Sequence, residues 1–381
     1  MSFIKEITNK EIHSGSPGYK ECNKCLMDTS DGSISFKDKV CNYCRDYELM
    51  KSSSWDPSEK GYEILEKKIK QIKEKNKSNK YDCILGLSGG LDSSYLALIL
   101  KEFDLRVLAI HVDGGWNSEL AVNNIQTIIE HCEFDLHTHV VDWEAMKNLQ
   151  LAFFRSGISN LDIPQDHVFF AVLYSIAQKF NIKTFMSGGN FATESILPSY
   201  WQCDAMDSIF IKDIFNNFGE GSISGYKTIS FFNLKILFRL KGFQQLRPLN
   251  YLPYGDEIAL EKLEKIGWRN YSTKHGESIF TKFFQNYFLI KRYGYDKRRA
   301  HYSSRILSND MTREQAKELI SKELYSPLDL NQDKDYVSKK LDISQSELDS
   351  FLFLPKRNYD QFKNWSKYMT IGSKINKFLS R

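Results

Sequence analysis

The sequence predicts an α/β protein whose parallel, doubly wound sheet follows an N-terminal four-cysteine module and precedes a C-terminal helical subdomain. From Tyr81 onward, short apolar runs alternate with longer amphipathic runs, as in strands joined by crossover helices. Four of the seven cysteines fall within the first 44 residues. Near the other end, Thr312 with Gln315 and Ser344 with Glu347 have the spacing of helix capping boxes.

The chain divides into four parts. Residues 1–55 form the cysteine module, and residues 56–80 a helix that runs into the charged linker KEKNKSNK. The sheet and its helices are expected over residues 81–255. Within that part, residues 199–246 are aromatic and irregular, and they are interpreted as a substrate-side insertion or a subunit contact. Residues 256–381 hold a basic segment and then the helical subdomain.

The sheet is expected to contain four buried strands: YDCILGL, RVLAIHV, LHTHVVD and KTFMSG. The intervening helices are SYLALILKEF, SELAVNNIQTIIEHC and the stretch Pro164–Phe180. Strands alternating with helices imply right-handed crossovers and helices on both faces of the sheet. Ligands of such sheets bind beyond the carboxyl ends of the strands. The glycine-rich loops of this sequence follow such strands, so we expect the functional site there.

Composition excludes several classes of protein. The chain has 381 residues, 41% of them hydrophobic, with 52 basic against 48 acidic residues, which excludes a mainly disordered protein. No run of about 18 apolar residues is present, so no membrane-spanning helix is expected. The N-terminal segment lacks the apolar core of a secretory signal. We therefore expect a soluble, cytoplasmic protein. The segment from Lys265 to Arg305 carries ten basic and two acidic residues, which favours an anionic ligand.

The four N-terminal cysteines form two CxxC pairs separated by fifteen residues: Cys22, Cys25, Cys41 and Cys44. This spacing is typical of a tetrahedral zinc site in which each pair contributes two thiolates from one turn. An iron–sulfur cluster and disulfides are the alternatives. A closed four-thiolate site leaves no position for water, so the zinc would be structural. The other three cysteines are expected to be structural as well: Cys83, Cys132 and Cys203.

The loop Ser88-Gly89-Gly90-Leu91-Asp92-Ser93-Ser94 follows the first strand and opens a helix. Its glycines allow a tight turn, its serines add hydroxyl donors, and the helix N-terminus presents free N–H groups to an anion. Asp92 would repel bare phosphate, which suggests a bridging magnesium ion. The loop is neither a Walker A loop nor a GxGxxG dinucleotide fingerprint.

This loop resembles the signature SGGxDS of the PP-loop ATP pyrophosphatases, a family with the adenine nucleotide alpha-hydrolase-like (HUP-like) fold. The resemblance implies cleavage of ATP between its α and β phosphates, with AMP as leaving group. It implies that pyrophosphate and magnesium lie against Ser88, Gly89, Gly90, Asp92, Ser93 and Ser94. It places adenosine against His111, Val112, Asp113 and Trp116. It places the α phosphate near Gly188, Gly189 and Asn190.

Three further stretches are similar to the N-acetyl sugar amidotransferases of bacterial surface-polysaccharide synthesis. These act on diacetamido-uronic acid nucleotides and on pseudaminic- or legionaminic-type sugars. These stretches are HVDGGWNSE, GGNFATES and HGESIFTKFFQNYFLIKRYGYDKRRAHYSSR. The resemblance implies that ATP activates an acetamido oxygen and that ammonia displaces AMP to give an acetamidino group. It further implies an anionic, nucleotide-linked or acidic sugar substrate, as in O-antigen, lipopolysaccharide or flagellin glycans. Separate glutaminase and cyclase-like subunits would supply the ammonia.

Charged residues of the basic segment and the second glycine loop complete the expected site. Substrate contacts are expected from Lys274, Arg298, Arg299 and His301. Catalytic roles are expected for Asp92, Glu194 and Lys282. Cations would stabilise the charge that develops on the leaving pyrophosphate. Glu194 would steer ammonia or accept its proton.

Two other functions fit parts of the sequence. A tRNA thiolation enzyme also combines a PP-loop with CxxC pairs, and its basic, aromatic segment would contact RNA. Sulfur transfer needs a catalytic cysteine, for which Cys203 alone lies in a loop-like context, so we expect no nucleic acid partner. A zinc-containing nucleotide sensor without turnover is the other alternative, which the intact Asp92 disfavours.

Overall fold

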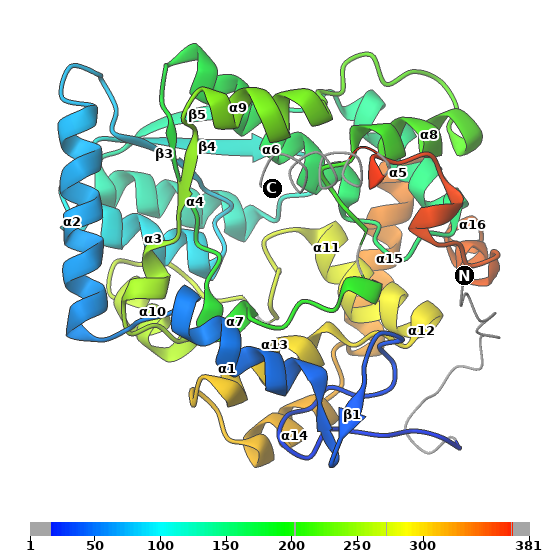
Figure 1. Cartoon of the computed structure of the whole chain (residues 1–381). Helices are drawn as coiled ribbons and strands as arrows, with labels where there is room; N and C mark the ends of the chain where they lie inside the picture. Colours follow the sequence, from blue (N-terminus) through cyan, green and yellow to red (C-terminus); the bar gives the residue numbers. More distant parts are fainter. Residues whose placement is uncertain (1–16, 202, 272, 367, 369–381) are drawn as a thin grey trace, which may run out of the picture.

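The computed structural model describes residues 17–201, 203–271, 273–366 and 368. A five-stranded parallel sheet lies at its centre, in the order β5-β4-β3-β6-β7 (Figure 1). The strands are β3 (Cys83–Gly86), β4 (Val107–Asp113), β5 (Asp135–Val140), β6 (Thr184–Met186) and β7 (Gln244–Leu246). The α/β fold with a parallel sheet is therefore confirmed. The strand β7 lies in the region that the sequence left unassigned.

Helices cover both faces of the sheet, because alternate strand residues point to opposite sides. On one side, Cys83 and Leu85 of β3 pack with α2 (Glu59–Lys75), α3 (Leu91–Glu102) and α4 (Glu119–Cys132). On the other side, Ile84 packs in the same cluster as α5 (Trp143–Ser156) and α6 (Ile163–Lys179). This arrangement confirms the doubly wound sheet.

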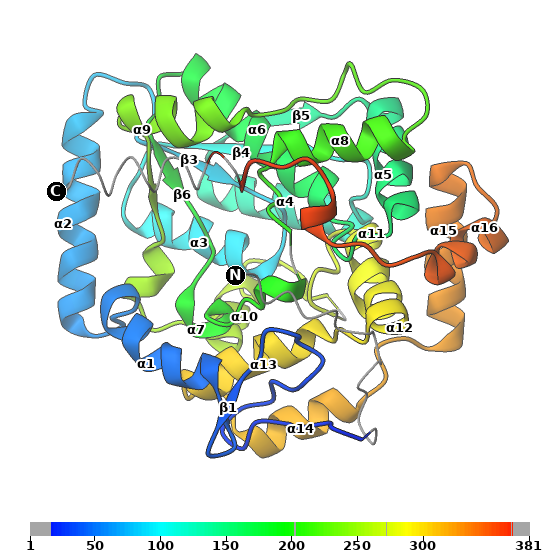
Figure 2. The same ribbon diagram turned by 45° about the vertical axis from the view of Figure 1, so that its right-hand side comes forward.

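The cysteine module contains a short antiparallel hairpin, β1 (Phe36–Lys37) with β2 (Val40–Cys41). Both turn residues of the hairpin, Asp38 and Lys39, have positive φ angles of 51° and 62°. The helix α1 (Asn42–Ser54) follows at once. The module lies beside α13 (Lys297–Leu307) and α14 (Arg313–Ser321) in both views (Figures 1 and 2). It is attached there, since the Leu26 backbone N–H donates to Ser303 Oγ at 2.9 Å.

The remaining helices follow β6 in chain order and carry much of the site described below. They are α7 (Phe191–Glu194), α8 (Ser208–Phe218), a π-helical turn (Asn233–Leu237), α9 (Phe238–Leu240), α10 (Asp256–Glu264), α11 (Ile279–Phe283), a second π-helical turn (Phe284–Phe288), α12 (Leu289–Tyr293), α13 (Lys297–Leu307), α14 (Arg313–Ser321), α15 (Pro327–Leu341) and α16 (Gln345–Ser350). Short 3₁₀ turns lie at Ser199–Trp201, Pro248–Tyr251, Phe351–Phe353 and Tyr359–Gln361.

The C-terminal region is helical, as expected. Thr312 and Gln315 form both halves of a capping box at the start of α14. Ser344 accepts from the Glu347 backbone N–H at the start of α16. The Glu347 carboxylate instead lies 3.9 Å from Arg155, so the second box has only its N-cap half.

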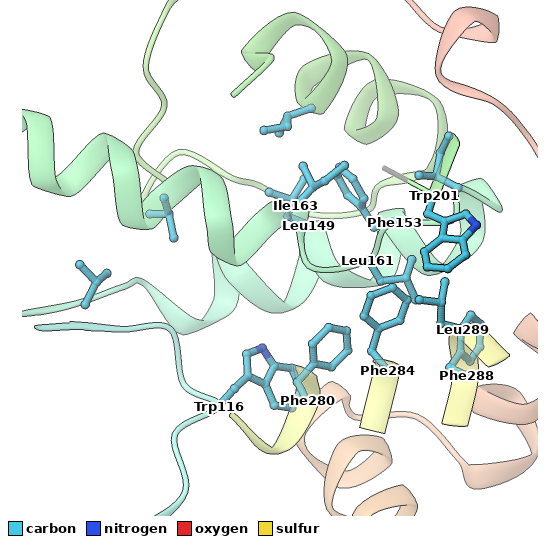
Figure 3. Close-up of a cluster of buried hydrophobic side chains, with 14 of the residues drawn as sticks. Trp116, Leu149, Phe153, Leu161, Ile163, Trp201, Phe280, Phe284, Phe288 and Leu289 are labelled. Carbon is cyan, nitrogen blue, oxygen red and sulfur yellow. The ribbon is translucent and has the colours of Figure 1, made fainter. Parts of the chain in front are cut away.

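An aromatic core joins the sheet domain to this helical region. Trp116, which follows β4, lies 5.0 Å from Phe280 of α11 between ring centroids and 5.1 Å from Trp143. Figure 3 shows Trp116 and Phe280 side by side, with Phe284 and Phe288 further along the same helical stretch. Among the described residues, no helix combines the length and the apolar character needed to cross a membrane.

Candidate active site

The loop after β3 turns sharply before α3 begins at Leu91. Gly89 has φ +82°, and a Cβ there would lie 2.7 Å from the Ala121 carbonyl oxygen, so only glycine fits. Ser88 Oγ lies 3.1 Å from Ser93 Oγ and accepts from the Gly90 backbone N–H at 3.2 Å. Among the residues that the structure describes, no side chain caps the start of α3. The first N–H groups of this helix are therefore available to an anion.

Asp92 joins this loop to the loop after β6. Its Oδ1 accepts from Asn190 Nδ2 at 3.1 Å and from the Tyr254 hydroxyl. Gly188 lies so near that a Cβ there would be 2.9 Å from the Asp92 carbonyl carbon. Burial, and then repulsion by the Glu194 carboxylate, raise the pKa of Asp92 to about 6. The two loops therefore concentrate negative charge at one point.

A cavity of about 460 Å³, which we call the phosphate-loop cavity, opens between these loops and the basic segment. It is lined by Ser88, Gly90, Asp92 and Ser93 of the first loop and by Gly188, Gly189 and Glu194 of the second. The opposite wall comes from Asp256, Tyr271, Lys274, His275, Glu277, His301 and Arg305. Residues of three distant chain segments thus surround the start of α3.

A charged network crosses this cavity. The Lys274 ammonium lies 3.7 Å from Glu194 Oε1 and 3.1 Å from His301 Nδ1. Burial, and then the Lys274 charge, lower the pKa of His301. The same Nδ1 of His301 lies 3.0 Å from the Thr193 carbonyl oxygen. Asp256 lies 3.7 Å from His301 Nε2 and 2.9 Å from Arg305 Nη1, and its pKa is lowered to about 2. Lys274 is therefore held as a cation at the cavity wall.

A second cavity of about 410 Å³, the strand-end cavity, lies beyond the carboxyl ends of β3 and β4. Its walls include His111, Val112 and Asn117, and the α6 side chains of Phe169 and Leu173. His111 is fixed on both ring nitrogens, by the Leu87 carbonyl oxygen at 3.1 Å and by Asn117 Nδ2 at 3.0 Å. The strand-end cavity shares Ser88, His275 and Glu277 with the phosphate-loop cavity.

A third cavity of about 370 Å³, the basic-segment cavity, lies on the other side of Lys274. It shares Glu194, Thr273, Lys274, His275 and His301 with the phosphate-loop cavity. It shares His275, Gln285 and Lys297 with the strand-end cavity. The three cavities therefore have common walls and meet around His275.

The structure brings many of the expected residues together. Those that line the phosphate-loop cavity are Ser88, Gly90, Asp92, Ser93, Gly188, Gly189, Glu194, Lys274 and His301. Those that line the strand-end cavity are His111 and Val112. Gly89 and Asn190 do not line the phosphate-loop cavity, but they fix the conformation of its two loops. Ser94 is buried and accepts from Trp268 Nε1 at 3.1 Å, so its hydroxyl serves packing rather than the cavity.

Two residues that were expected beside adenosine make contacts within the fold instead. Trp116 is 1% exposed and belongs to the aromatic core (Figure 3). Asp113 Oδ1 accepts from the Gly115 backbone N–H at 2.8 Å and from Asn117 Nδ2 at 3.1 Å, which shapes the turn after β4. Trp116 is too buried to contact adenosine, so we correct its assignment. Asp113 does not line the strand-end cavity either, and its expected role stays a prediction.

Two basic residues of the expected site lie elsewhere in the structure. Lys282 pairs with Asp333 of α15 at 2.6 Å, since α11 presents Ser278 and Thr281 to the strand-end cavity and turns Lys282 away. Arg299 pairs with Asp28 and Glu21 of the cysteine module at 2.9 and 3.0 Å. These two side chains do not line the three cavities.

Arg298 does line the basic-segment cavity. Its guanidinium, however, pairs with Asp296 at 2.7 Å and donates to the Lys322 carbonyl oxygen at 2.9 Å. The Arg298 side chain therefore links the C-terminal end of α14 to the start of α13. The structure thus places Arg298 in the cavity wall, and its expected contact with substrate stays a prediction.

The four cysteines of the module fit a single tetrahedral metal ion. Their sulfurs all lie within 4.8 Å of one another, with Cys22–Cys44 and Cys25–Cys41 at 3.7 Å. A zinc ion with Zn–S bonds of about 2.3 Å needs sulfur atoms about 3.8 Å apart. The spacing is too long for disulfides, and the four are free thiols. Backbone N–H groups of Lys24 and Met27 also donate to the sulfurs of the first pair, at 3.4 Å each.

Several residues of the cavity walls were missed by the sequence analysis. His275 and Glu277 begin the stretch HGES, which was noted for its resemblance but not assigned a role. Tyr254 and Asp256 lie in a region without a recognisable motif, so no sequence signal identified them. Lys297 was counted only as one charge among ten.

Comparison with known families assigns the C-terminal part of the chain. Residues 277–376 match the family described as LPS biosynthesis protein WbpG-like, C-terminal domain. The matched segment begins at Glu277, in the cavity wall, and includes the helices α11 to α16. The match agrees with the expected link to surface-polysaccharide synthesis over this segment.

Other similarities are shorter or more distant. A segment of 78 residues is 35% identical to the uncharacterized protein MJ1599 of Methanocaldococcus jannaschii, covering 20% of this chain and 28% of that protein. NMN synthetase from Francisella tularensis is similar in structure, with TM-score 0.35, 13% identity, and coverage of 74% of this chain and 97% of that chain. NH3-dependent NAD synthetase from Campylobacter jejuni has TM-score 0.29, 16% identity, and coverage of 54% and 83%.

Proposed function

We propose that this chain is an ATP-dependent, AMP-forming amidotransferase of lipopolysaccharide or related surface-polysaccharide synthesis. It converts the acetamido group of an anionic sugar to an acetamidino group, with ammonia from a partner glutaminase and its cyclase-like subunit. The observation that carries the proposal is the junction of three cavities around Lys274 and His275, with the loop Ser88–Ser94 in the middle one. Such a junction accommodates a nucleotide, its phosphates and a second substrate.

Each cavity has a distinct role in this proposal. Adenosine occupies the strand-end cavity beside His111 and Val112. The β and γ phosphates lie at the start of α3, where free N–H groups and the hydroxyls of Ser88 and Ser93 contact them. The acetamido sugar approaches from the basic-segment cavity, so its amide oxygen reaches the α phosphate near Lys274.

Magnesium fits the phosphate-loop cavity, because Asp92 and Glu194 already repel each other there. Asp92, with Ser88 and Ser93, would hold the ion, which neutralises phosphate charge when bound. Zinc would be held by the four cysteines and would stabilise the module that carries them. The four cysteines of that module do not line the three cavities.

The side chains that remain have roles in the chemistry. The amide oxygen attacks the α phosphorus, and pyrophosphate leaves toward the Lys274 ammonium, which stabilises the developing charge. Ammonia then adds to the imidate carbon, and AMP departs with the former amide oxygen. Glu194, at the boundary of two cavities, accepts the proton that ammonia releases.

The alternative, tRNA thiolation, is less consistent with the position of Cys203. Burial, and then the charges of Asp360 and Asp204, raise the pKa of this thiol to about 12, whereas sulfur transfer uses a thiolate. Cys203 does not line any of the three cavities.

The test is release of pyrophosphate and AMP by the purified chain with magnesium, ATP, ammonia and a panel of anionic 2-acetamido sugars. We expect release that requires both ammonia and an acetamido sugar, survives in Cys203→Ser and is abolished in Asp92→Ala. Release that depends on tRNA and proceeds without an acetamido sugar would refute the proposal. ATP binding without turnover under every condition would instead indicate a nucleotide sensor.

A further inference from the structure

The basic-segment cavity contains buried polar groups that have no partner in the described part of the protein. These are Trp201 Nε1, Thr273 Oγ1 and Asn286 Nδ2, and all three residues line the cavity. Buried polar atoms are nearly always hydrogen-bonded in folded proteins, because an unmade bond costs about 1–3 kcal/mol. A ligand with hydroxyl and amide groups in this cavity would satisfy them.

Lys297 differs from the other cations of this cavity wall. The others have carboxylate partners: Lys274 pairs with Glu194, Arg298 with Asp296, and Lys322 with Glu318. Within the residues that the structure describes, no carboxylate lies within ion-pair distance of the Lys297 ammonium. The carboxyl of Asp166 is near enough for its pKa to respond to Lys297, but burial and then Asp162 raise that pKa to about 7. Asp166 is therefore only partly ionised at neutral pH and compensates Lys297 incompletely.

The position of Lys297 makes this charge available to a ligand. It is the first residue of α13 and lines both the basic-segment cavity and the strand-end cavity. The lining of the basic-segment cavity also includes the apolar residues Ile196, Leu197 and Pro198, which follow α7. A volume of about 370 Å³ lies at the lower end of the range of small-molecule pockets. The cavity thus combines one uncompensated cation, unpaired neutral polar groups and an apolar wall.

We propose that the basic-segment cavity binds the acceptor sugar, with Lys297 paired to its acid group and Asn286, Trp201 and Thr273 hydrogen-bonded to its hydroxyl and acetamido groups. This inference rests on the proposed function and assigns its acceptor site. Lys297 is then a specificity-determining residue that selects acidic over neutral acetamido sugars. The charge-assisted bond to Lys297 accounts for that preference, since such bonds are about twice as strong as neutral ones.

Equilibrium binding tests this assignment without requiring turnover. The probes are 2-acetamido-2-deoxyglucuronic acid and N-acetylglucosamine, which differ only in the acid group, measured with magnesium and α,β-methylene-ATP filling the nucleotide site. We expect the wild-type chain to bind the acid at least about tenfold more tightly than the neutral sugar. Lys297→Met should reduce this preference to less than about twofold. Asn286→Asp removes an N–H donor and adds a negative charge, so this variant should bind the acidic sugar more weakly than the wild-type chain does.

Lys291→Met is the matched control, because Lys291 belongs to the same basic segment but is exposed and outside the three cavities. It should retain the full preference, and binding of the ATP analogue should be unchanged in all variants. An acid preference that survives Lys297→Met, or equal binding of both probes to the wild type, would overturn the assignment. If the acid binds as expected but pyrophosphate is never released, the acceptor site stands and the proposed reaction fails.

Discussion

Asn190 donates a hydrogen bond of 3.1 Å from its side-chain amide to Oδ1 of Asp92, across 98 positions of the sequence. The same Asn190 caps α7, where its Oδ1 accepts from the Thr193 backbone N–H at 2.9 Å. One side chain therefore fixes both the orientation of the Asp92 carboxylate and the start of the helix that carries Glu194.

Asn190→Asp separates these two functions. The new carboxylate keeps an oxygen for the helix cap but loses the donor to Asp92 and repels it. We expect kcat/KM for ATP to fall by about tenfold or more. The unfolding temperature should fall as well, because the new carboxylate is buried beside Asp92 although the helix cap is kept. Steady-state pyrophosphate release and thermal unfolding measure the two effects. Asn181→Asp, at an exposed position, is the control. A variant with unchanged kcat/KM would show that Asp92 does not depend on this bond.

Metal content tests the cysteine module. Purified protein should contain about one zinc per chain, and Cys22→Ser/Cys25→Ser should lose it and unfold at lower temperature, because two of four ligands are gone. Loss of the zinc should also destabilise α14, because Arg313 of this helix donates to the Cys22 and Cys25 carbonyl oxygens at 2.9 and 3.1 Å. Elemental analysis and thermal unfolding provide the measurements, with Cys203→Ser as control. A brown, iron-containing protein would refute the zinc assignment.

Arg299→Met should affect stability rather than substrate binding. The side chain is 15% exposed and faces Asp28, which is 4% exposed, so removing it leaves a buried carboxylate without its partner. Loss of one member of a buried pair costs about 3–5 kcal/mol. We expect a decrease of that order in the free energy of unfolding by urea, and an acceptor KM within about twofold of wild type. Arg269→Met, at an exposed position, should change neither. A large increase in acceptor KM would contradict this prediction and indicate that Arg299 contacts the substrate.

The central sheet and the loop at its edge could be predicted because their signals are local. The strand containing Cys83 is a short apolar run, and the glycines and serines after it occupy consecutive positions. Parallel strands bring such loops to one edge of the sheet, so Gly188 was expected near Asp92 and lies there. The strand β7 was missed because its three residues, Gln244–Leu246, are mostly polar and pair at the sheet edge.

The choice among cations could not be made from the sequence. Lys282 and Lys297 both lie in the basic segment, and their helices begin only after the chain has turned at Ser278 and Asp296. Which side of each helix faces the cavity depends on packing against α15 and the cysteine module. Trp116 was misassigned for a similar reason, since an aromatic residue after a strand can face a ligand or a second domain. Here it meets Phe280, more than 150 positions away.

The stability of the fold should depend on pH through His167, which is fully buried in α6. Its Nδ1–H donates to the Ala205 carbonyl oxygen at 2.9 Å, and its Nε2 accepts from the Ile229 backbone N–H at 3.0 Å. The neutral ring thus ties the region after Trp201 to the sheet domain. Burial lowers the pKa of His167 to about 4 in the folded state, against about 6.5 in the unfolded chain.

The unfolded chain takes up a proton at higher pH than the folded chain. The contribution of the neutral His167 to the free energy of unfolding is therefore full above about pH 6.5 and is lost as the pH falls toward 4. The shift corresponds to about 3 kcal/mol. His167→Gln should therefore be less stable than wild type at pH 8, and the difference should shrink by most of that amount at pH 4.5. Urea unfolding at the two pH values measures it, with His131→Gln, an exposed histidine, as control. An equal stability difference at both pH values would show that His167 is not the group that couples folding to protonation.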